Sequence, residues 1–213
     1  MIKRMFLCLV IIVLAFFSIL GYAYLIEPNL LRVKSFQIET KQPITPCTLV
    51  FFTDTHFGKY YDIGHIKHIV EKINQAKPDL VVFGGDLFDH YARDRDHMDL
   101  NELKEEMNKI EAKVGKYAVW GNHDYGGGAV RIYEDFMSSC GFELLDNEST
   151  VFEAYGIELI GYDDYLMGWT DPSLYHIEND LFHVILAHEP VVSQWLDSPG
   201  DNFMLSGHTP VGI

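Results

Sequence analysis

The sequence predicts an α/β fold with α+β character in its second half: a two-sheet β-sandwich flanked by helices, with an N-terminal transmembrane helix. Up to about residue 140, apolar runs alternate with segments whose apolar residues recur at helical spacing. That alternation implies parallel strands joined by right-handed crossovers. From residue 142, short strands follow one another at hairpin-like spacing, which predicts antiparallel pairing in a second sheet. The third observation is an uncharged stretch near the N-terminus.

This stretch runs from Met5 to Ile26 and holds 22 residues without a charge. A helix of that length reaches ~33 Å, enough to cross a ~30 Å hydrocarbon core. Tyr22 and Tyr24 lie where an interfacial aromatic belt is expected. The sequence therefore predicts that residues 1–26 are a single-pass anchor in the cell membrane.

Lys3 and Arg4 precede the apolar stretch, which predicts a cytoplasmic N-terminus and an extracytoplasmic catalytic domain. A buried core helix and a cleaved signal peptide are the alternatives. The stretch exceeds the usual ~7–15 apolar residues of a signal peptide and lacks an A-x-A-like cleavage site. We expect residues 27–46, with three prolines, to be a linker with one strand at 35–40, and residues 47–213 to be one domain.

The elements of the domain follow from its periodicity. Apolar residues repeat at helical spacing from Ile63 to Ile73 and from Leu100 to Ile110, which predicts two helices. Apolar runs with residues on both faces predict buried strands. Five such runs each end in polar residues: TLVFFTD (48–54), LVVFGGD (80–86), YAVWGNHD (117–124), FHVILAHE (182–189) and NFMLSGH (202–208).

The composition narrows the function. The chain is 48% hydrophobic and 22% charged, which excludes intrinsic disorder, and three cysteines exclude a disulfide scaffold. Its net charge of −15 disfavours nucleic-acid binding, because phosphate backbones are repelled. An acidic chain that handles phosphate needs bound metal ions. The strand ends offer candidate ligands, which we expect to meet at one edge of one sheet: Asp54, His56, Asp86, Asn122, His188 and His208.

Carboxylate, amide and imidazole ligands without thiolate suit Mn²⁺, Fe or Zn²⁺, and suit Mg²⁺ less well. Two cations ~3.5–4 Å apart that share a carboxylate can clamp a displacement at phosphorus. The ordered motifs D-T-H (54–56), G-D-L-F-D (85–89), G-N-H-D (121–124), A-H-E-P (187–190) and S-G-H-T (206–209) resemble those of the calcineurin-like metallophosphoesterases. Within that family the chain looks most like the membrane-anchored bacterial branch, which resembles UDP-2,3-diacylglucosamine pyrophosphohydrolases.

The resemblance implies two metal ions and a phosphorylated small molecule or lipid-linked phosphate as substrate. It assigns Asp54 and His56 to the first metal, Asp86 to both, and Asn122, His188 and His208 to the second. His123 is then an acid toward the leaving oxygen or a phosphate contact, and Asp89 pairs with this histidine and orients it. His90 stands where some relatives carry arginine, and is a candidate substrate contact.

The resemblance is incomplete at the last motif, where the family has a second histidine and this chain has Pro210. We therefore expect a C-terminally truncated domain whose first metal has one ligand fewer. Each residue also has a structural alternative: Asp54 and Asp86 could cap helices, and Asn122 could form a turn. His188 could be a strand-end histidine, and His208 a core or C-terminal histidine. The functional alternatives are a metal-binding but impaired protein, and a binding domain with coincidental motifs. The sequence indicates no oligomeric state.

Overall fold

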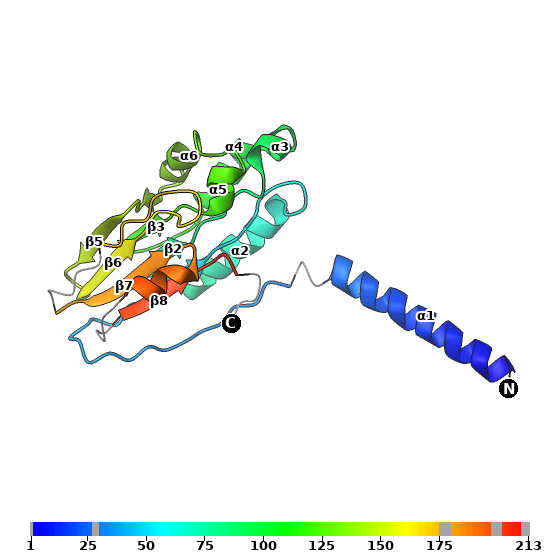
Figure 1. Cartoon of the computed structure of the whole chain (residues 1–213). Helices are drawn as coiled ribbons and strands as arrows, with labels where there is room; N and C mark the ends of the chain where they lie inside the picture. The colour runs from blue at the N-terminus through cyan, green and yellow to red at the C-terminus, as the bar shows by residue number, and fades with distance from the viewer. Residues whose placement is uncertain (1, 27–29, 175–179, 197–201, 210–213) are drawn as a thin grey trace. The chain divides into compact units, whose positions relative to one another are not determined.

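The structure, a computed structural model, describes residues 2–26, 30–174, 180–196 and 202–209 (Figure 1). The chain divides into two compact units, residues 1–36 and 37–213. The first unit is dominated by helix α1 (Ile2–Leu25), none of whose residues is buried. By length and composition α1 could cross a membrane. The core-helix alternative is therefore wrong, whereas the anchor and the signal peptide both stay open.

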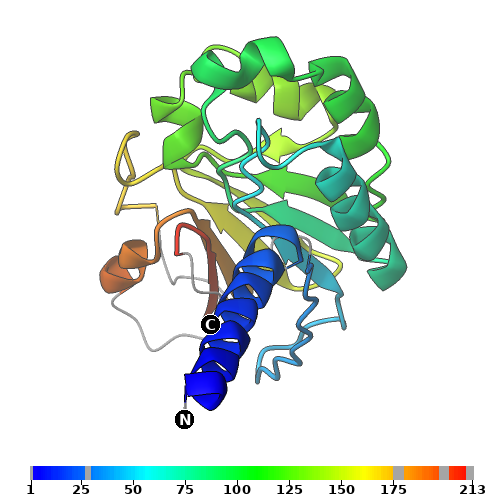
Figure 2. The same cartoon turned by 90° about the vertical axis from the view of Figure 1, so that its right-hand side faces the viewer.

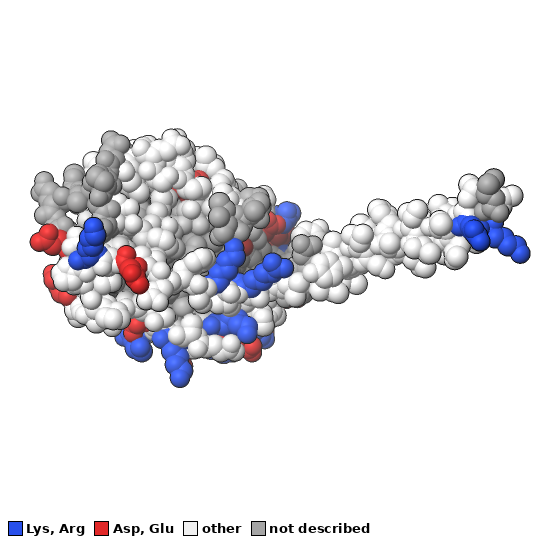
Figure 3. Space-filling model, turned by 90° about the horizontal axis from the view of Figure 1, so that it is seen from below, with Lys and Arg blue, Asp and Glu red and all other residues white. Residues whose placement is uncertain are grey.

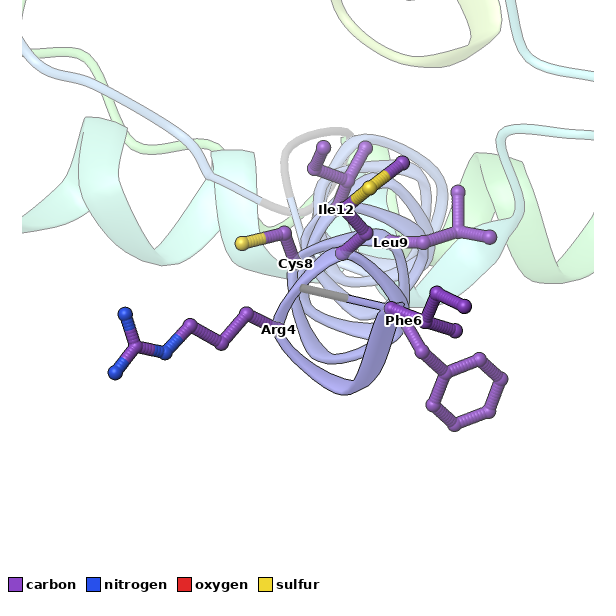
Figure 4. A pocket seen from close by; sticks show the side chains of 7 residues that line it. Arg4, Phe6, Cys8, Leu9 and Ile12 are labelled. Carbon is purple, nitrogen blue, oxygen red and sulfur yellow. The ribbon is translucent and has the colours of Figure 1, made fainter.

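Two views show the character of α1. Its surface is uncharged except at the basic end near Lys3 and Arg4 (Figure 3). Seen along its axis, Phe6, Leu9 and their neighbours radiate outward, and the shallow hollow between them is lined by residues of α1 alone (Figure 4). That hollow is a property of a bare helix and not a candidate active site.

The second unit begins with a parallel sheet of order β1-β2-β3-β4. Helical segments connect its strands, as the alternation in the sequence predicts. Asp62 starts the first of these helices by accepting a hydrogen bond from the Gly64 backbone at 2.9 Å. The elements are β1 (Leu49–Phe52), α2 (Ile63–Ala76), β2 (Leu80–Phe83), α3 (Tyr91–Asp94), η2 (Arg95–His97), α4 (Leu100–Met107), β3 (Gly115–Ala118), α5 (Asn122–Gly126), α6 (Tyr133–Ser139) and β4 (Glu143–Leu144).

A second sheet of order β5-β6-β7-β8 follows in the chain. The β5–β6 pair is an antiparallel hairpin with Gly156 in its turn, at a φ of 68°. The other two pairs are parallel. The elements are β5 (Glu148–Phe152), β6 (Ile157–Gly161), β7 (Phe182–Ala187), η3 (Pro190–Trp195) and β8 (Asn202–Ser206).

The core follows the alternation of side chains along the strands. In β2, Val81 and Phe83 pack with the helices, while Leu80 and Val82 pack against the second sheet. In β7, Val184 and Leu186 face the first sheet, whereas Ile185 and Ala187 pack near η3. The helices therefore cover one face of the first sheet, and the second sheet covers the other (Figures 1 and 2).

Three expectations were wrong in detail. Residues 35–40 form no strand. The segment from residue 142 extends the first sheet as the parallel strand β4, because α6 returns the chain to that sheet's edge. The strands at 182–187 and 202–206 belong to the second sheet. An apolar pattern on both faces is the same whether helices or another sheet covers the strand, so periodicity could not distinguish the two.

Candidate metal centre

The predicted ligands lie in loops that directly follow the carboxyl ends of strands in both sheets. Asp54 and His56 follow β1, Asp86 follows β2, and Asn122 begins α5 after β3. His188 and His208 follow β7 and β8 of the second sheet. The expectation that the ligands meet at one edge of a single sheet is therefore wrong, because they gather where the ends of two packed sheets meet.

The backbone at four of these positions is left-handed. Asp54, His56, Asp86 and His208 have φ values of 52°, 43°, 58° and 62°. Such a conformation in a residue other than glycine costs about 1–3 kcal/mol and persists where surrounding structure enforces it. Neither Asp54 nor Asp86 caps a described helix, so the capping alternative is wrong for both.

Glycines in two motifs allow the loops to approach each other. A Cβ on Gly121 would lie 2.2 Å from the Asp86 nitrogen, and one on Gly207 would lie 2.2 Å from Thr53 Oγ1. The second contact joins the last strand of one sheet to the first strand of the other. The next residue, His208, donates its backbone N–H to the Asp54 carboxylate at 3.2 Å. The glycines of G-N-H-D and S-G-H-T are thus explained by packing of the loops.

The first ligand group consists of Asp54, His56 and Asp86. Their ligand atoms all lie within 4.8 Å of one another. His56 Nε2 is 3.8 Å from Asp54 Oδ1 and 3.8 Å from Asp86 Oδ2. His56 Nδ1 is buried without a hydrogen-bond partner in the described part of the chain. The two 3.8 Å distances place Nε2 between two carboxylates, as expected of a metal ligand.

The second group is centred on Asn122 Oδ1. It lies 3.1 Å from His188 Nε2 and 2.9 Å from His208 Nδ1, and the same Nε2 is 3.2 Å from Asp86 Oδ2. His188 Nδ1 donates to the Gly84 carbonyl at 2.7 Å, so the neutral ring keeps its lone pair on Nε2. An outer hydrogen bond of this kind commonly fixes a metal-bound histidine. Nitrogen and oxygen ligand atoms converge here, and either a proton on His188 or a bound cation relieves the repulsion between their lone pairs.

The electrostatics of the second group also favour a cation. Burial opposes a charge on His188, but the hydrogen bond and negative charge of Asp86 raise the pKa of this imidazole to about 9. Burial likewise opposes the charge of Asp86, while His188 lowers the pKa of that carboxyl. The field that would hold a proton on His188 in the absence of metal also attracts a metal ion, so these donors fit the divalent cations that the sequence predicts.

Asp86 is the residue that the two groups share. Its Oδ2 faces His56 in one group and His188 in the other. Its Oδ1 accepts the backbone N–H of His123 at 2.8 Å, which fixes the orientation of the carboxylate. The geometry thus agrees with a bridging ligand, although the individual ligand assignments remain predictions.

His123 stands beside both groups. Its Nδ1 donates to the backbone carbonyl of Asp89 at 2.6 Å, and its Nε2 stays available. The Asp89 carboxylate lies 3.7 Å from His123 Nδ1 and is held instead by Arg93 Nη2 at 2.5 Å. Asp89 therefore orients the histidine through its main chain. A third possible ligand group of His56, Asp89 and His123 is weakened because Nδ1 of His123 is already bonded.

His90 does not join the predicted ligands. It is exposed at the start of α3, where its Nδ1 accepts the backbone N–H of Arg93 at 3.3 Å. Only its Nε2 is left for a substrate, and this role remains a prediction.

Sequence reasoning missed the role of Asp124, the last residue of G-N-H-D. This fully buried carboxylate accepts backbone N–H groups from Asp86, Leu87, Phe88 and Gly121 at 2.9 to 3.4 Å. It therefore holds the loop of Asp86 against the loop of Asn122. The motif itself was the available signal, because its fourth residue is an acid with no assigned role.

A buried acidic pair was also missed. Asp164 and Glu189 lie in the interior, where burial and the neighbouring Glu189 raise the pKa of Asp164 to about 7. Glu189 Oε2 accepts the backbone N–H of Tyr165 at 2.9 Å. Glu189 also lies with His188 and His208 in a group of potential ligands, but the hydrogen bond to Tyr165 assigns it a structural role.

Comparison with known proteins agrees with this geometry. Residues 47–212 match the calcineurin-like phosphoesterase family. The chain is 32% identical to the uncharacterized metallophosphoesterase YkuE of Bacillus subtilis, covering 90% of this chain and 69% of that protein. It is 27% identical to the phosphodiesterase YaeI of Escherichia coli, covering 99% and 78%.

A third relative is a zebrafish (Danio rerio) protein described as a transmembrane protein with metallophosphoesterase domain. It is 29% identical, and the match covers 77% of this chain and 40% of that protein. The family match spans nearly the whole second unit and includes every strand-end residue of the candidate site. The binding-domain alternative with coincidental motifs is therefore wrong: the chain belongs to the calcineurin-like phosphoesterases and is a metal-dependent phosphoesterase.

Proposed function

We propose that this protein hydrolyses phosphoester or pyrophosphate bonds with two divalent metal ions while anchored in the cell membrane. The observation that supports it best is the position of Asp86 Oδ2, 3.8 Å from His56 Nε2 on one side and 3.2 Å from His188 Nε2 on the other. A carboxylate oxygen between two donor groups is what a dinuclear centre requires. The substrates are phosphorylated small molecules or lipid-linked phosphates.

The proposed centre divides its ligands between the two groups. When bound, the metal ions activate water and neutralise charge on the phosphate. Mn²⁺, Fe and Zn²⁺ fit the mixed carboxylate and imidazole donors, whereas Mg²⁺ fits them less well. The first metal takes Asp54, His56 and Asp86, and the second takes Asp86, Asn122, His188 and His208.

His123 supplies the proton in this proposal. The Asp89 carbonyl only accepts, so Nδ1 of His123 carries hydrogen and the protonated ring can donate from Nε2. Arg93 holds the Asp89 carboxylate, and the same segment presents its carbonyl to His123. The ring is thereby fixed to give its proton to the leaving oxygen, a contribution of about 10²–10⁴ in rate.

The alternative is a metal-binding protein with impaired catalysis. It is supported by Pro210, which stands where the family has its second histidine and lies outside the described residues. The first metal then has three protein ligands against four for the second. Counting bound metal and measuring turnover of bis(p-nitrophenyl) phosphate separates the two functions, because the impaired protein binds metal without turnover.

Removal of the shared ligand tests the metal centre. We expect Asp86→Ala to lose more bound metal than His56→Ala or His208→Ala, because it takes a donor from both metals. Asp135→Ala, at an exposed position on α6, is the matched control and should keep both metal and turnover. Equal metal losses in the three ligand variants would show that Asp86 is not shared.

The anchor is tested separately. We expect the full chain to fractionate with membranes and to resist extraction at high salt, with the N-terminus cytoplasmic and the phosphoesterase domain outside. Protease added to intact cells should then digest the domain. Recovery of the uncleaved chain in the soluble fraction would refute anchoring without touching the proposed chemistry.

A further inference from the structure

The segment between β6 and β7 carries an unusual concentration of exposed apolar side chains. Tyr165, Leu166, Met167 and Trp169 are 42%, 53%, 55% and 70% exposed, and the stretch 165–169 has no charged residue. We call these five residues the apolar loop. Among the other described residues of the second unit, large exposed apolar side chains are isolated along the sequence: Ile38, Tyr60, Val114, Val130 and Val151.

The backbone of the apolar loop is held by two aspartates at its base. Asp163 Oδ2 accepts the N–H of Trp169 at 2.6 Å, and Asp164 Oδ1 accepts the N–H of Met167 at 2.6 Å. Asn147 Nδ2 donates to the Trp169 carbonyl at 2.8 Å. Hydrogen bonds of this number fix the loop, so its apolar side chains stay exposed instead of folding back into the core.

The base of the loop is joined to the candidate metal centre. Tyr165 donates its N–H to Glu189, the residue after His188. Tyr125 of α5 donates its hydroxyl to Asp163 at 2.9 Å, and Met167 Cε lies 3.6 Å from where a Cβ of Gly126 would be. Figures 1 and 2 show the loop, in gold, beside the short green helix α5. The apolar loop therefore borders the helix that begins with Asn122 and His123.

From this juxtaposition we propose that the apolar loop contacts the hydrocarbon region of a phospholipid bilayer and places lipid-linked phosphodiesters next to the metal centre. The inference rests on the proposed function. Tryptophan and tyrosine are the side chains that favour the bilayer interface, and leucine and methionine favour its apolar interior. The loop and the catalytic helix α5 then face the same lipid surface.

The size of the surface favours lipid over a protein partner. Four large side chains of ~200 Å² each, exposed to the fractions given above, offer on the order of 400 Å² of apolar surface. A stable protein interface needs roughly 800 Å² from each partner. A bilayer held nearby by α1 is present at high effective concentration, so a weak apolar contact suffices.

The absence of charge from the loop distinguishes the kind of binding. Residues 165–169 include no lysine or arginine, so the contact cannot depend on anionic headgroups. Binding through this loop should be the same in neutral and anionic vesicles and should persist at high salt, where exposed ionic attractions are screened.

Fluorescence of Trp169 tests the contact without any need for turnover. The full chain is reconstituted in phosphatidylcholine vesicles with brominated acyl chains, which quench tryptophan in contact with hydrocarbon. We expect strong quenching in the wild type, lost in Trp169→Phe and unaffected by salt. The other tryptophans, Trp120 and Trp195, provide the background. Equal quenching in both proteins would overturn the proposal, as would quenching that disappears at high salt.

A second measurement connects the loop to the substrate. The Leu166→Ser/Met167→Ser/Trp169→Ser variant and the wild type are compared on phosphatidylglycerol in these vesicles and on soluble bis(p-nitrophenyl) phosphate. Because the variant removes three half-exposed apolar side chains, its loss in kcat/KM should be at least about tenfold larger on the lipid than on the soluble substrate. Val114→Ser/Val130→Ser/Val151→Ser is the exposed-site control. Equal losses on both substrates would refute a lipid role, and loop-dependent self-association would identify a protein interface instead.

The two measurements also separate this proposal from the function on which it rests. If the wild type hydrolyses neither substrate, the proposed chemistry fails, while the quenching of Trp169 still decides the lipid contact. If soluble substrate is hydrolysed and Trp169 is not quenched, the chemistry stands and the lipid contact is refuted.

Discussion

Replacing Asp124 by asparagine should lower both the stability of the protein and its bound metal, although Asp124 is not itself a predicted ligand. The two carboxylate oxygens accept N–H groups from four residues on two loops. An asparagine keeps one oxygen, and its amide nitrogen then faces backbone donors that it cannot accept. These four donors make five hydrogen bonds to the carboxylate, of which at least two are lost, and the donors left behind remain buried.

The cost can be estimated from those bonds. Hydrogen bonds to a charged group contribute about 1.5–3 kcal/mol each, so two lost bonds cost about 3–6 kcal/mol. Burial raises the pKa of Asp124, and this favours the neutral acid and the lower end of the range. A loss of about 3 kcal/mol lowers Tm by roughly 6–12 °C in a domain of this size. The loops of Asp86 and Asn122 separate as well, so bound metal should fall.

The assay combines thermal unfolding in detergent with metal analysis of the purified protein. Asp135→Asn, on the exposed side of α6, makes the same chemical change without these bonds and should leave both quantities unchanged. A normal Tm together with full metal content in Asp124→Asn would refute the reasoning, because the carboxylate would then not organise the loops. A normal Tm with reduced metal would restrict its role to the geometry of the site.

Four further outcomes follow from the site. The His123→Ala variant should keep its bound metal and lose a factor of about 10²–10⁴ in rate. The loss should be smaller for substrates that release nitrophenolate, because this leaving group needs no proton. A loss of bound metal in this variant would instead make His123 a ligand. His188 must lose a proton to bind metal, so affinity in titrations should rise with pH up to about 9 and level above it; no pH dependence would contradict the Asp86–His188 pairing. In metal-free protein the raised pKa of His188 contributes to the free energy of unfolding. This contribution is fully present below pH ~6.5 and is lost as pH rises through 9. Thermal unfolding at a series of pH values measures it. Pro210→His should tighten the more weakly held metal in equilibrium dialysis, and an unchanged affinity would mean that one more histidine does not complete the first site.

The positions of the ligands could be predicted because strand ends are readable in sequence. Runs such as LVVFGGD show both the buried strand and the polar residue that ends it, and parallel pairing brings such ends together. The assignment of strands to sheets could not be predicted. Val184 and Leu186 pack against the first sheet, but an apolar pattern does not reveal what covers a strand.

Two kinds of information were beyond the sequence. Three of the four partners of Asp124 lie 36 to 38 residues away, and all four are backbone groups, which carry no signature of their own. The apolar loop reads Tyr-Leu-Met-Gly-Trp, a composition that ordinarily indicates burial. Its exposure follows from hydrogen bonds at its base, which include long-range contacts of Tyr125 with Asp163, of Asn147 with Trp169 and of Glu189 with Tyr165.

Metal binding is coupled to the last described strand, because the candidate ligands His208 and Asp54 are far apart in sequence and in contact in the structure. His208 donates its backbone N–H to Asp54, 154 residues earlier, and lies at the end of β8. This strand is only partly buried, pairs with β7 alone among the described strands, and should open more easily than the buried β2. A ligand that binds the closed form stabilises it by mass action. Added Mn²⁺ should therefore slow amide hydrogen exchange in β8 far more than in β2, and His208→Ala should weaken that protection. Equal protection of both strands would show that the metals stabilise the domain as a whole and that β8 does not close the site.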